Sequence, residues 1–137
     1  ISEIEEVTAK GGNWIILIKS ATNVLKGDNF VFVYPELLQN KTIVRRGEVI
    51  TSEILEKKDL DYKQINSKIK ILLRKTRDEI KLRGSIVNEI TTRGDFIKKI
   101  RDTLKINQNN KYRLEVVSLK DSKTADPIIV DLNISKL

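Results

Sequence analysis

The side chains best suited to chemistry in this sequence are the cations of one sixteen-residue run. Positions 68–83 carry seven basic residues and only two acidic ones, Asp78 and Glu79. At 3.6 residues per helical turn, four of the cations share one stripe, at i, i+4, i+7 and i+11. They are Lys70, Arg74, Arg77 and Lys81. Such a stripe can neutralise phosphates without reading bases, so it predicts a phosphate-directed surface. It would equally suit an acidic partner protein, an anionic membrane surface or plain solvation of an amphipathic helix.

A second group of cations lies on an expected helix over residues 95–105. Asp95 is placed to cap this helix, and an apolar stripe runs through Phe96, Ile97, Ile100 and Leu104. The outward side would carry Lys98, Lys99, Arg101 and Lys105. Arg101 alone could grip a guanine edge with two donors, whereas the lysines suit phosphates. The alternative is that all four are solvated surface residues.

Residue types that support catalysis are scarce. The chain has no Cys and no His, which excludes disulfides, thiolate and imidazole metal sites and His-dependent nucleophiles. The best acidic set is Glu115 with Asp126 or Asp131, plus Lys120, and it lacks the close acidic-x-Lys spacing of metal nucleases. Gly11, Gly12 and Gly27 form no phosphate-cradling loop. We therefore expect no enzymatic activity, no catalytic residue, no metal site and no cofactor.

Composition bounds the class of protein and its partners. A length of 137 residues, 39% of them hydrophobic and 33% charged, predicts one folded domain, and apolar runs of five residues predict no membrane span.

The formal net charge of +7 is unevenly distributed along the chain: residues 1–60 carry 8 basic and 9 acidic side chains, and residues 61–137 carry 18 basic and 10 acidic ones. The second half is therefore expected to meet nucleic acid, an acidic lipid surface or an acidic protein surface, the alternative being a basic helix surface that serves only solubility. DNA is favoured over RNA because few aromatic residues are free to stack on bases. The chain begins at Ile1 and has no Met, which predicts a processed or trimmed product.

The helices and strands that must position these residues are predicted to form an α+β fold in one domain, residues 1–137. Residues 1–46 are β-rich, with a strand expected at 14–18 that is buried on both faces and another at 30–34 that ends at Pro35. Residues 47–106 are expected to be helical, with a first helix near 49–55, a long one after Asp59 or Asp61 and a short one at 86–90. Gly84 would end the long helix. Residues 107–137 alternate apolar and polar side chains and predict a β-hairpin.

Three helices followed by a hairpin is the element order of a winged helix, and residues 86–104 resemble a helix-turn-helix. Gly94 would be the turn glycine, and Ile100, six residues later, the aliphatic residue that fixes the helix crossing. Ile90 departs from the pattern, since the family prefers Ala there. The resemblance spans residues 61–134 and implies that the helix at 95–105 enters the major groove, with residues 120–123 as a wing tip.

Two functions follow from these patterns. The first is a non-catalytic nucleic-acid-binding module whose contacts are mainly electrostatic. The second is a structural or assembly subunit of a larger particle, in which terminal strands and apolar helix faces contact neighbouring subunits. An oligomer, or a place in an assembly, is expected in the second case.

Overall fold

The computed structural model describes residues 14–20, 33–56, 61–87, 89–106 and 111–137. Contacts divide the chain into two compact units, Ile1–Lys41 and Thr42–Leu137. The expected α+β class is confirmed, with strands at both ends of the described chain and helices between them. The expected strand residues 30–32 lie outside the described residues.

The first unit contains a two-stranded antiparallel sheet. β1 (Trp14–Ser20) pairs with β2 (Val33–Gln39), and Ile18 lies opposite Pro35. Pro35 therefore lies inside a strand, contrary to the expectation that it ends one. Proline is tolerated there because an edge strand does not need every backbone N–H in the ladder. The expectation of burial on both faces of β1 is wrong, since Ile16 and Ile18 are 50% and 66% exposed.

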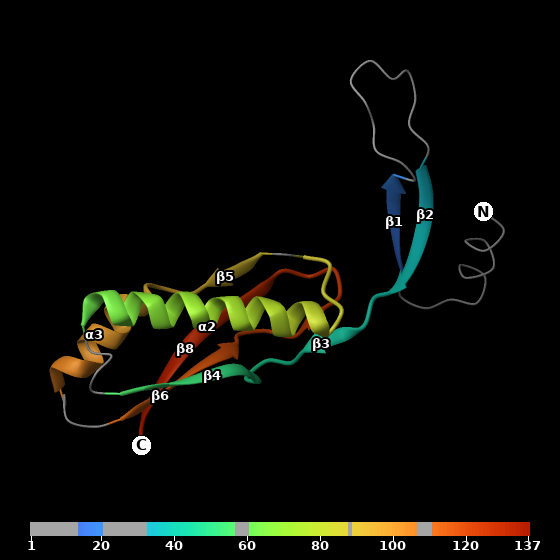
Figure 1. Ribbon diagram of the computed structural model, residues 1–137. Coiled ribbons are helices and arrows are strands. Elements are labelled where there is room, and N and C mark those ends of the chain that lie inside the picture. Colours follow the sequence, from blue (N-terminus) through green and yellow to red (C-terminus); the bar gives the residue numbers. More distant parts are fainter. Residues whose placement is uncertain (1–13, 21–32, 57–60, 88, 107–110) are drawn as a thin grey trace, which may run out of the picture. The chain divides into compact units, whose positions relative to one another are not determined.

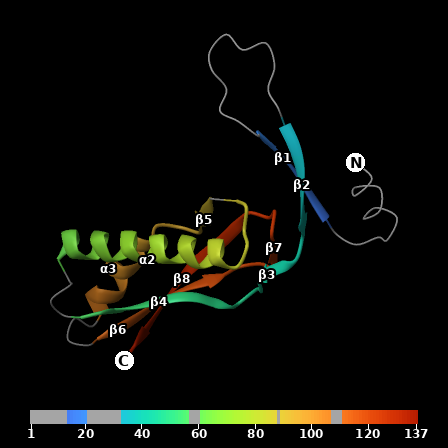
Figure 2. The same cartoon turned by 45° about the vertical axis from the view of Figure 1, so that its right-hand side comes forward.

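The second unit contains a four-stranded sheet and a two-stranded one (Figures 1 and 2). The larger sheet has the order β4-β6-β8-β5, and β5 runs parallel to β8 while the other pairs are antiparallel. Its strands are β4 (Val49–Leu55), β6 (Tyr112–Ser118), β8 (Ile128–Lys136) and β5 (Ile90–Thr92). The smaller sheet pairs β3 (Thr42–Val44) with β7 (Ser122–Lys123). The predicted C-terminal hairpin is confirmed as the β6–β8 pair.

Two helices cover one face of the larger sheet. α2 (Tyr62–Leu82) packs on β4, and α3 (Phe96–Ile106) packs on α2 and β8 (Figure 1). The buried side chains of helices and strands form one core, with Leu72, Ile100, Leu114 and Leu132 almost wholly inaccessible. Alternate residues of the strands point away from it, as period-2 geometry requires. The opposite face of the sheet therefore carries exposed residues such as Arg113 and Asn133.

The helix expected near residues 49–55 is instead the edge strand β4. Ile50 and Leu55 are five positions apart, which a regular strand would place on opposite faces, but a bulge between Val49 and Thr51 shifts the strand register. The shift allows Ile50 and Leu55 both to be buried. Pairing with β6 and the β-branched residues of this segment outweigh the local helical pattern.

The helix expected at residues 86–90 is also absent. Ser85 makes a local turn in which its Oγ accepts the Val87 N–H at 3.2 Å, and Ile90 begins β5 by pairing with Ile128. A strand therefore stands where the first helix of the helix-turn-helix was expected. The winged-helix-like reading is wrong, because the β-branched residues of this segment complete a sheet edge instead of packing on α3.

Predicted helix ends agree better with the structure. Gly84 has a φ of +104° directly after α2, and the N–H of Ser85 donates to the Ile80 carbonyl, as in a glycine-terminated helix. Asp95 caps α3 by accepting the N–H groups of Ile97 and Lys98 at 3.0 and 3.2 Å.

Candidate nucleic-acid interface

The inward face of α2 fixes the direction in which its cations point. Its buried residues are Ile65, Ile69, Leu72, Thr76 and Ile80. Thr76 fills the gap in this apolar stripe: its hydroxyl donates to the Leu72 carbonyl at 2.8 Å and lies 2.5 Å from the hydroxyl of Thr51 on β4. This contact and the apolar packing fix the orientation of α2 about its own axis, and so determine which side chains face solvent.

All four cations predicted for the stripe, Lys70, Arg74, Arg77 and Lys81, are exposed. Lys63 is exposed as well and lies seven residues before Lys70, on the same side of the helix. Sequence reasoning missed Lys63 although its i, i+7 spacing was available. Among the residues that the structure describes, none accepts a hydrogen bond from these five side chains or pairs with them. We call these five residues the cationic ridge.

The dimensions of the cationic ridge suit an extended polyanion. Lys63 and Lys81 are eighteen residues apart in sequence, so at about 1.5 Å per residue the ridge is about 27 Å long. B-form DNA carries one phosphate per strand about every 3.4 Å of its axis, so a duplex of that length holds about eight phosphates on each strand, and both strands wind around the axis. The five flexible cations can therefore neutralise at most five phosphates, those on the side of the duplex that faces the ridge.

The other cations of α2, and Arg83 at its C-cap, are engaged in contacts within the protein. Lys75 pairs with Glu53 of β4, and Arg83 pairs with Glu48 and with Glu79, the latter at 3.0 Å. The Glu48 hydrogen bond is the main reason why the pKa of Arg83 is raised above its ordinary value, although burial opposes this effect. Arg83 also donates to the Ile43 carbonyl at 3.2 Å, so it joins the end of α2 to the strands.

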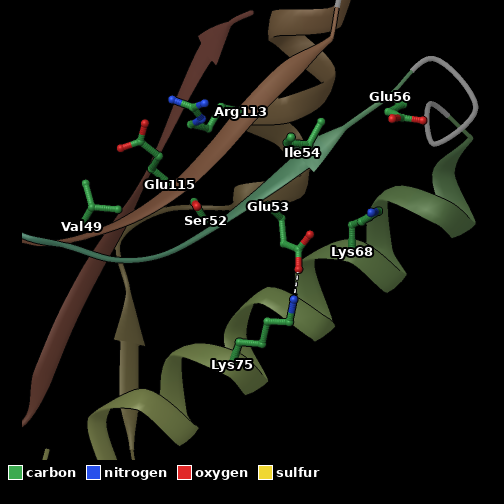
Figure 3. Close-up of a pocket in the computed structure, with 9 residues that line it drawn as sticks. All are labelled: Val49, Ser52, Glu53, Ile54, Glu56, Lys68, Lys75, Arg113 and Glu115. Carbon is green, nitrogen blue, oxygen red and sulfur yellow. Dashed lines mark hydrogen bonds and ion pairs between the residues drawn. The ribbon is translucent and has the colours of Figure 1, made fainter.

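A hollow of about 720 Å³ lies along β4 (Figure 3). Unlike the cationic ridge, it is lined by charges of both signs. Three acidic and three basic side chains line it, together with Val49, Ser52 and Ile54. The charged residues are Glu53, Glu56, Glu115, Lys68, Lys75 and Arg113. Because the charges balance and Glu53 is paired with Lys75, the hollow has no strong preference for an anion.

The cations of α3 make more contacts within the protein. Lys99 pairs with Asp131 at 3.2 Å, and the Arg101 guanidinium lies 4.4 Å from the centre of the Tyr62 ring. Lys98 is exposed, and the side chain of Lys105 lies outside the described residues. Burial of Asp131 is the largest influence on its pKa and raises it, but the hydrogen bond from the Leu132 N–H and the charge of Lys99 together lower it below its ordinary value. With no helix-turn-helix in place, a groove-reading role for Arg101 stays a prediction.

The remaining candidates are not brought together. Among the described residues, no three acidic side chains lie close enough to hold a metal ion, so Glu115, Asp126 and Asp131 do not form such a group. Of the two tyrosines in the second unit, Tyr112 is buried, and Tyr62 is exposed with Arg101 over one face of its ring. Within the described part of the chain, neither helix combines the length and the apolar character that crossing a membrane requires.

Comparison of the chain with family models, with curated proteins and with solved structures finds no match.

Proposed function

We propose that this protein binds nucleic acid without catalysis, through phosphate contacts made by the cationic ridge of α2. One observation carries the proposal: five exposed cations follow one side of a helix and have no partner among the described residues. Cations placed only for solubility would gain from nearby carboxylates, and this helix does pair Lys75 and Arg83 in that way. The ridge is thus left free to meet an external anion.

Duplex DNA is the form of nucleic acid that this surface fits best. Base stacking on aromatic rings dominates recognition of single strands. Tyr112 is buried and Arg101 lies over one face of the Tyr62 ring, so Tyr62, 51% exposed, is the one exposed aromatic residue that the described part of the second unit offers for stacking. Arg101 also adds a cation beside the N-terminal end of the ridge, because Tyr62 precedes Lys63. Phosphate contacts of this kind are independent of base sequence.

A titration of the full chain against a labelled mixed-sequence duplex, at about 50 and 200 mM salt, tests this function. We expect binding at the lower salt that falls by two or more orders of magnitude at the higher salt. A single strand of equal length should bind more weakly. Absence of binding to either nucleic acid at the lower salt would contradict the proposal.

A second candidate function is that of a structural subunit in a larger assembly. The exposed apolar residues of β1 and β2 favour it, because a soluble protein seldom leaves such a surface uncovered. Salt separates the two functions, since an apolar subunit interface responds to salt far less than phosphate contacts do.

A further inference from the structure

Tyr62 is the exposed aromatic residue of the second unit within the described part of the chain. Phe96 and Tyr112 are 5% and 3% exposed and belong to the core, whereas Tyr62 is 51% exposed. Tyr62 is the first residue of α2, and Lys63, where the cationic ridge begins, follows it directly. A planar aromatic group therefore lies at one end of the ridge.

Arg101 of α3 covers one face of this ring. Its guanidinium carbon lies 4.4 Å from the centre of the ring, within the distance of about 6 Å at which a cation is attracted to an aromatic face. Arg101 is itself exposed. The contact restrains both side chains, so that they lose little further freedom when a ligand binds on them. Aromatic rings and guanidinium planes are also the groups on which proteins stack unpaired nucleobases. We call Tyr62 and Arg101 the stacking pair.

Cations flank the stacking pair on both helices. α2 and α3 pack against each other within the second unit (Figure 1). Lys63 follows Tyr62 on α2, and Lys98 lies three residues before Arg101 on α3, so it is a neighbour of Arg101 on the helix surface. Both lysines are exposed. A base that stacks on the pair brings the phosphates on either side of it, and Lys63 and Lys98 can neutralise them.

One stacking pair suits one unpaired base better than a length of single strand. Proteins that bind single strands stack successive bases on several aromatic side chains. The described part of the second unit offers a single exposed ring, whereas the cationic ridge suits the phosphates of a duplex. The two surfaces together fit a duplex that ends in an unpaired base.

We propose that the stacking pair binds one unpaired base of a nucleic acid whose duplex part lies along the cationic ridge. This inference rests on the proposed function, because the ridge must hold the duplex. It names the preferred ligand, which is a duplex with a single-stranded extension. Any of the four bases should serve, because each has a π-face and stacking does not read hydrogen-bonding groups.

Three labelled ligands test this preference with the unmodified full chain. The first is a blunt duplex, and the second is the same duplex with a short single-stranded extension. The third has the same extension without its bases, so that its phosphates are retained. At about 50 mM salt the second ligand should bind about 5- to 150-fold more tightly than the third, which is the effect of stacking one base. The salt slopes of these two ligands should agree, because their phosphate contacts are equal.

Substitutions assign the effect to the stacking pair. Tyr62→Leu keeps an apolar side chain but removes the ring, and should bring the affinities for the second and third ligands to within about twofold of each other. Tyr62→Phe keeps the ring and is the matched control, which should retain the preference. Arg74→Glu, in the middle of the ridge, should weaken all three complexes by a similar factor and leave the ratio of the second to the third unchanged.

The outcomes separate this inference from the proposed function. Absence of binding to all three ligands at the lower salt would contradict the function itself. Binding to all three, with equal affinity for the second and the third, would overturn the stacking pair and leave the ridge in place. An unchanged ratio in Tyr62→Leu would also overturn it, even with weaker binding to every ligand, because a general loss would mean that the ring only joins α3 to the start of α2.

Discussion

Reversing two charges of the cationic ridge tests its role most directly. Arg74 and Arg77 lie in the middle of the ridge, both are exposed, and neither has a partner among the described residues. The double variant Arg74→Glu/Arg77→Glu should therefore fold normally. Each reversal lowers the net charge by two, so the chain would change from +7 to +3.

The size of the effect follows from the number of phosphates neutralised. Five contacts on B-form DNA predict a slope of about −4.5 for log affinity against log salt, which is a loss of about 500-fold between 50 and 200 mM. With three contacts left, the slope becomes about −2.7 and the loss between the same salts about 40-fold. Affinity at the lower salt should also fall similarly for duplexes of unrelated sequence, because phosphates carry no sequence information.

Arg45→Glu/Arg46→Glu is the matched control, since both residues are exposed in the turn between β3 and β4 and the change in net charge is the same. Fluorescence anisotropy at four or more salt concentrations gives the slopes of all three proteins. A slope unchanged by Arg74→Glu/Arg77→Glu, or lowered equally by the control, would refute the ridge. Loss of binding to only one sequence would show that these arginines read bases.

Three further predictions concern the fold that holds the ridge in place. Leu72→Ala should lower the free energy of unfolding by about 2–5 kcal/mol because Leu72 is fully buried on the inward face of α2, whereas Leu82→Ala, at an exposed position, should change it by less than about 0.5 kcal/mol in urea titrations. Asp95→Ala should cost about 1 kcal/mol in the same assay, because it leaves two N–H groups of α3 without their acceptor; an unchanged midpoint would mean that solvent replaces the cap. The lowered pKa of Asp131 stabilises the fold above the pKa of the unfolded carboxyl, about 3.9, and this stability is lost as pH falls through the lower pKa of the folded state. Lys99→Met should therefore reduce the loss of stability below pH 4, and an identical pH profile in thermal melts would show that Lys99 has no part in it.

Local signals in the sequence were sufficient for the long helix and its surface. The apolar stripe from Ile65 to Ile80 has one period, that of a helix, over 16 residues, and Gly84 supplies the positive φ that ends it. A cation at i, i+4, i+7 and i+11 must then lie on one side. The exposure of the ridge could be anticipated for the same reason, because an apolar stripe on one side of a helix leaves the opposite side to solvent.

Short segments were the ones that sequence reasoning misplaced. Residues 49–55 and 86–90 each hold apolar residues at spacings that fit a helix turn as well as a strand. Their state depends on partners distant in the chain: β4 requires β6, about sixty residues later, and β5 requires β8. Nothing within five to seven residues specifies those partners, so periodicity alone could not decide between helix and strand.

The sequence by itself determined the α+β class, the course of α2 and its glycine end, the Asp95 cap of α3 and the line of exposed cations on α2, because helical periodicity and turn chemistry act over neighbouring residues. Only the tertiary structure decided the order of the strands in the sheet and showed that no helix-turn-helix forms at residues 86–104. It also decided that Lys75, Arg83 and Lys99 form ion pairs with carboxylates, and that Ile16 and Ile18 are exposed. Each of these depends on contacts between residues far apart in the chain. Strand pairing and ion pairs form wherever the folded chain brings matching groups together, and linear spacing does not encode that proximity.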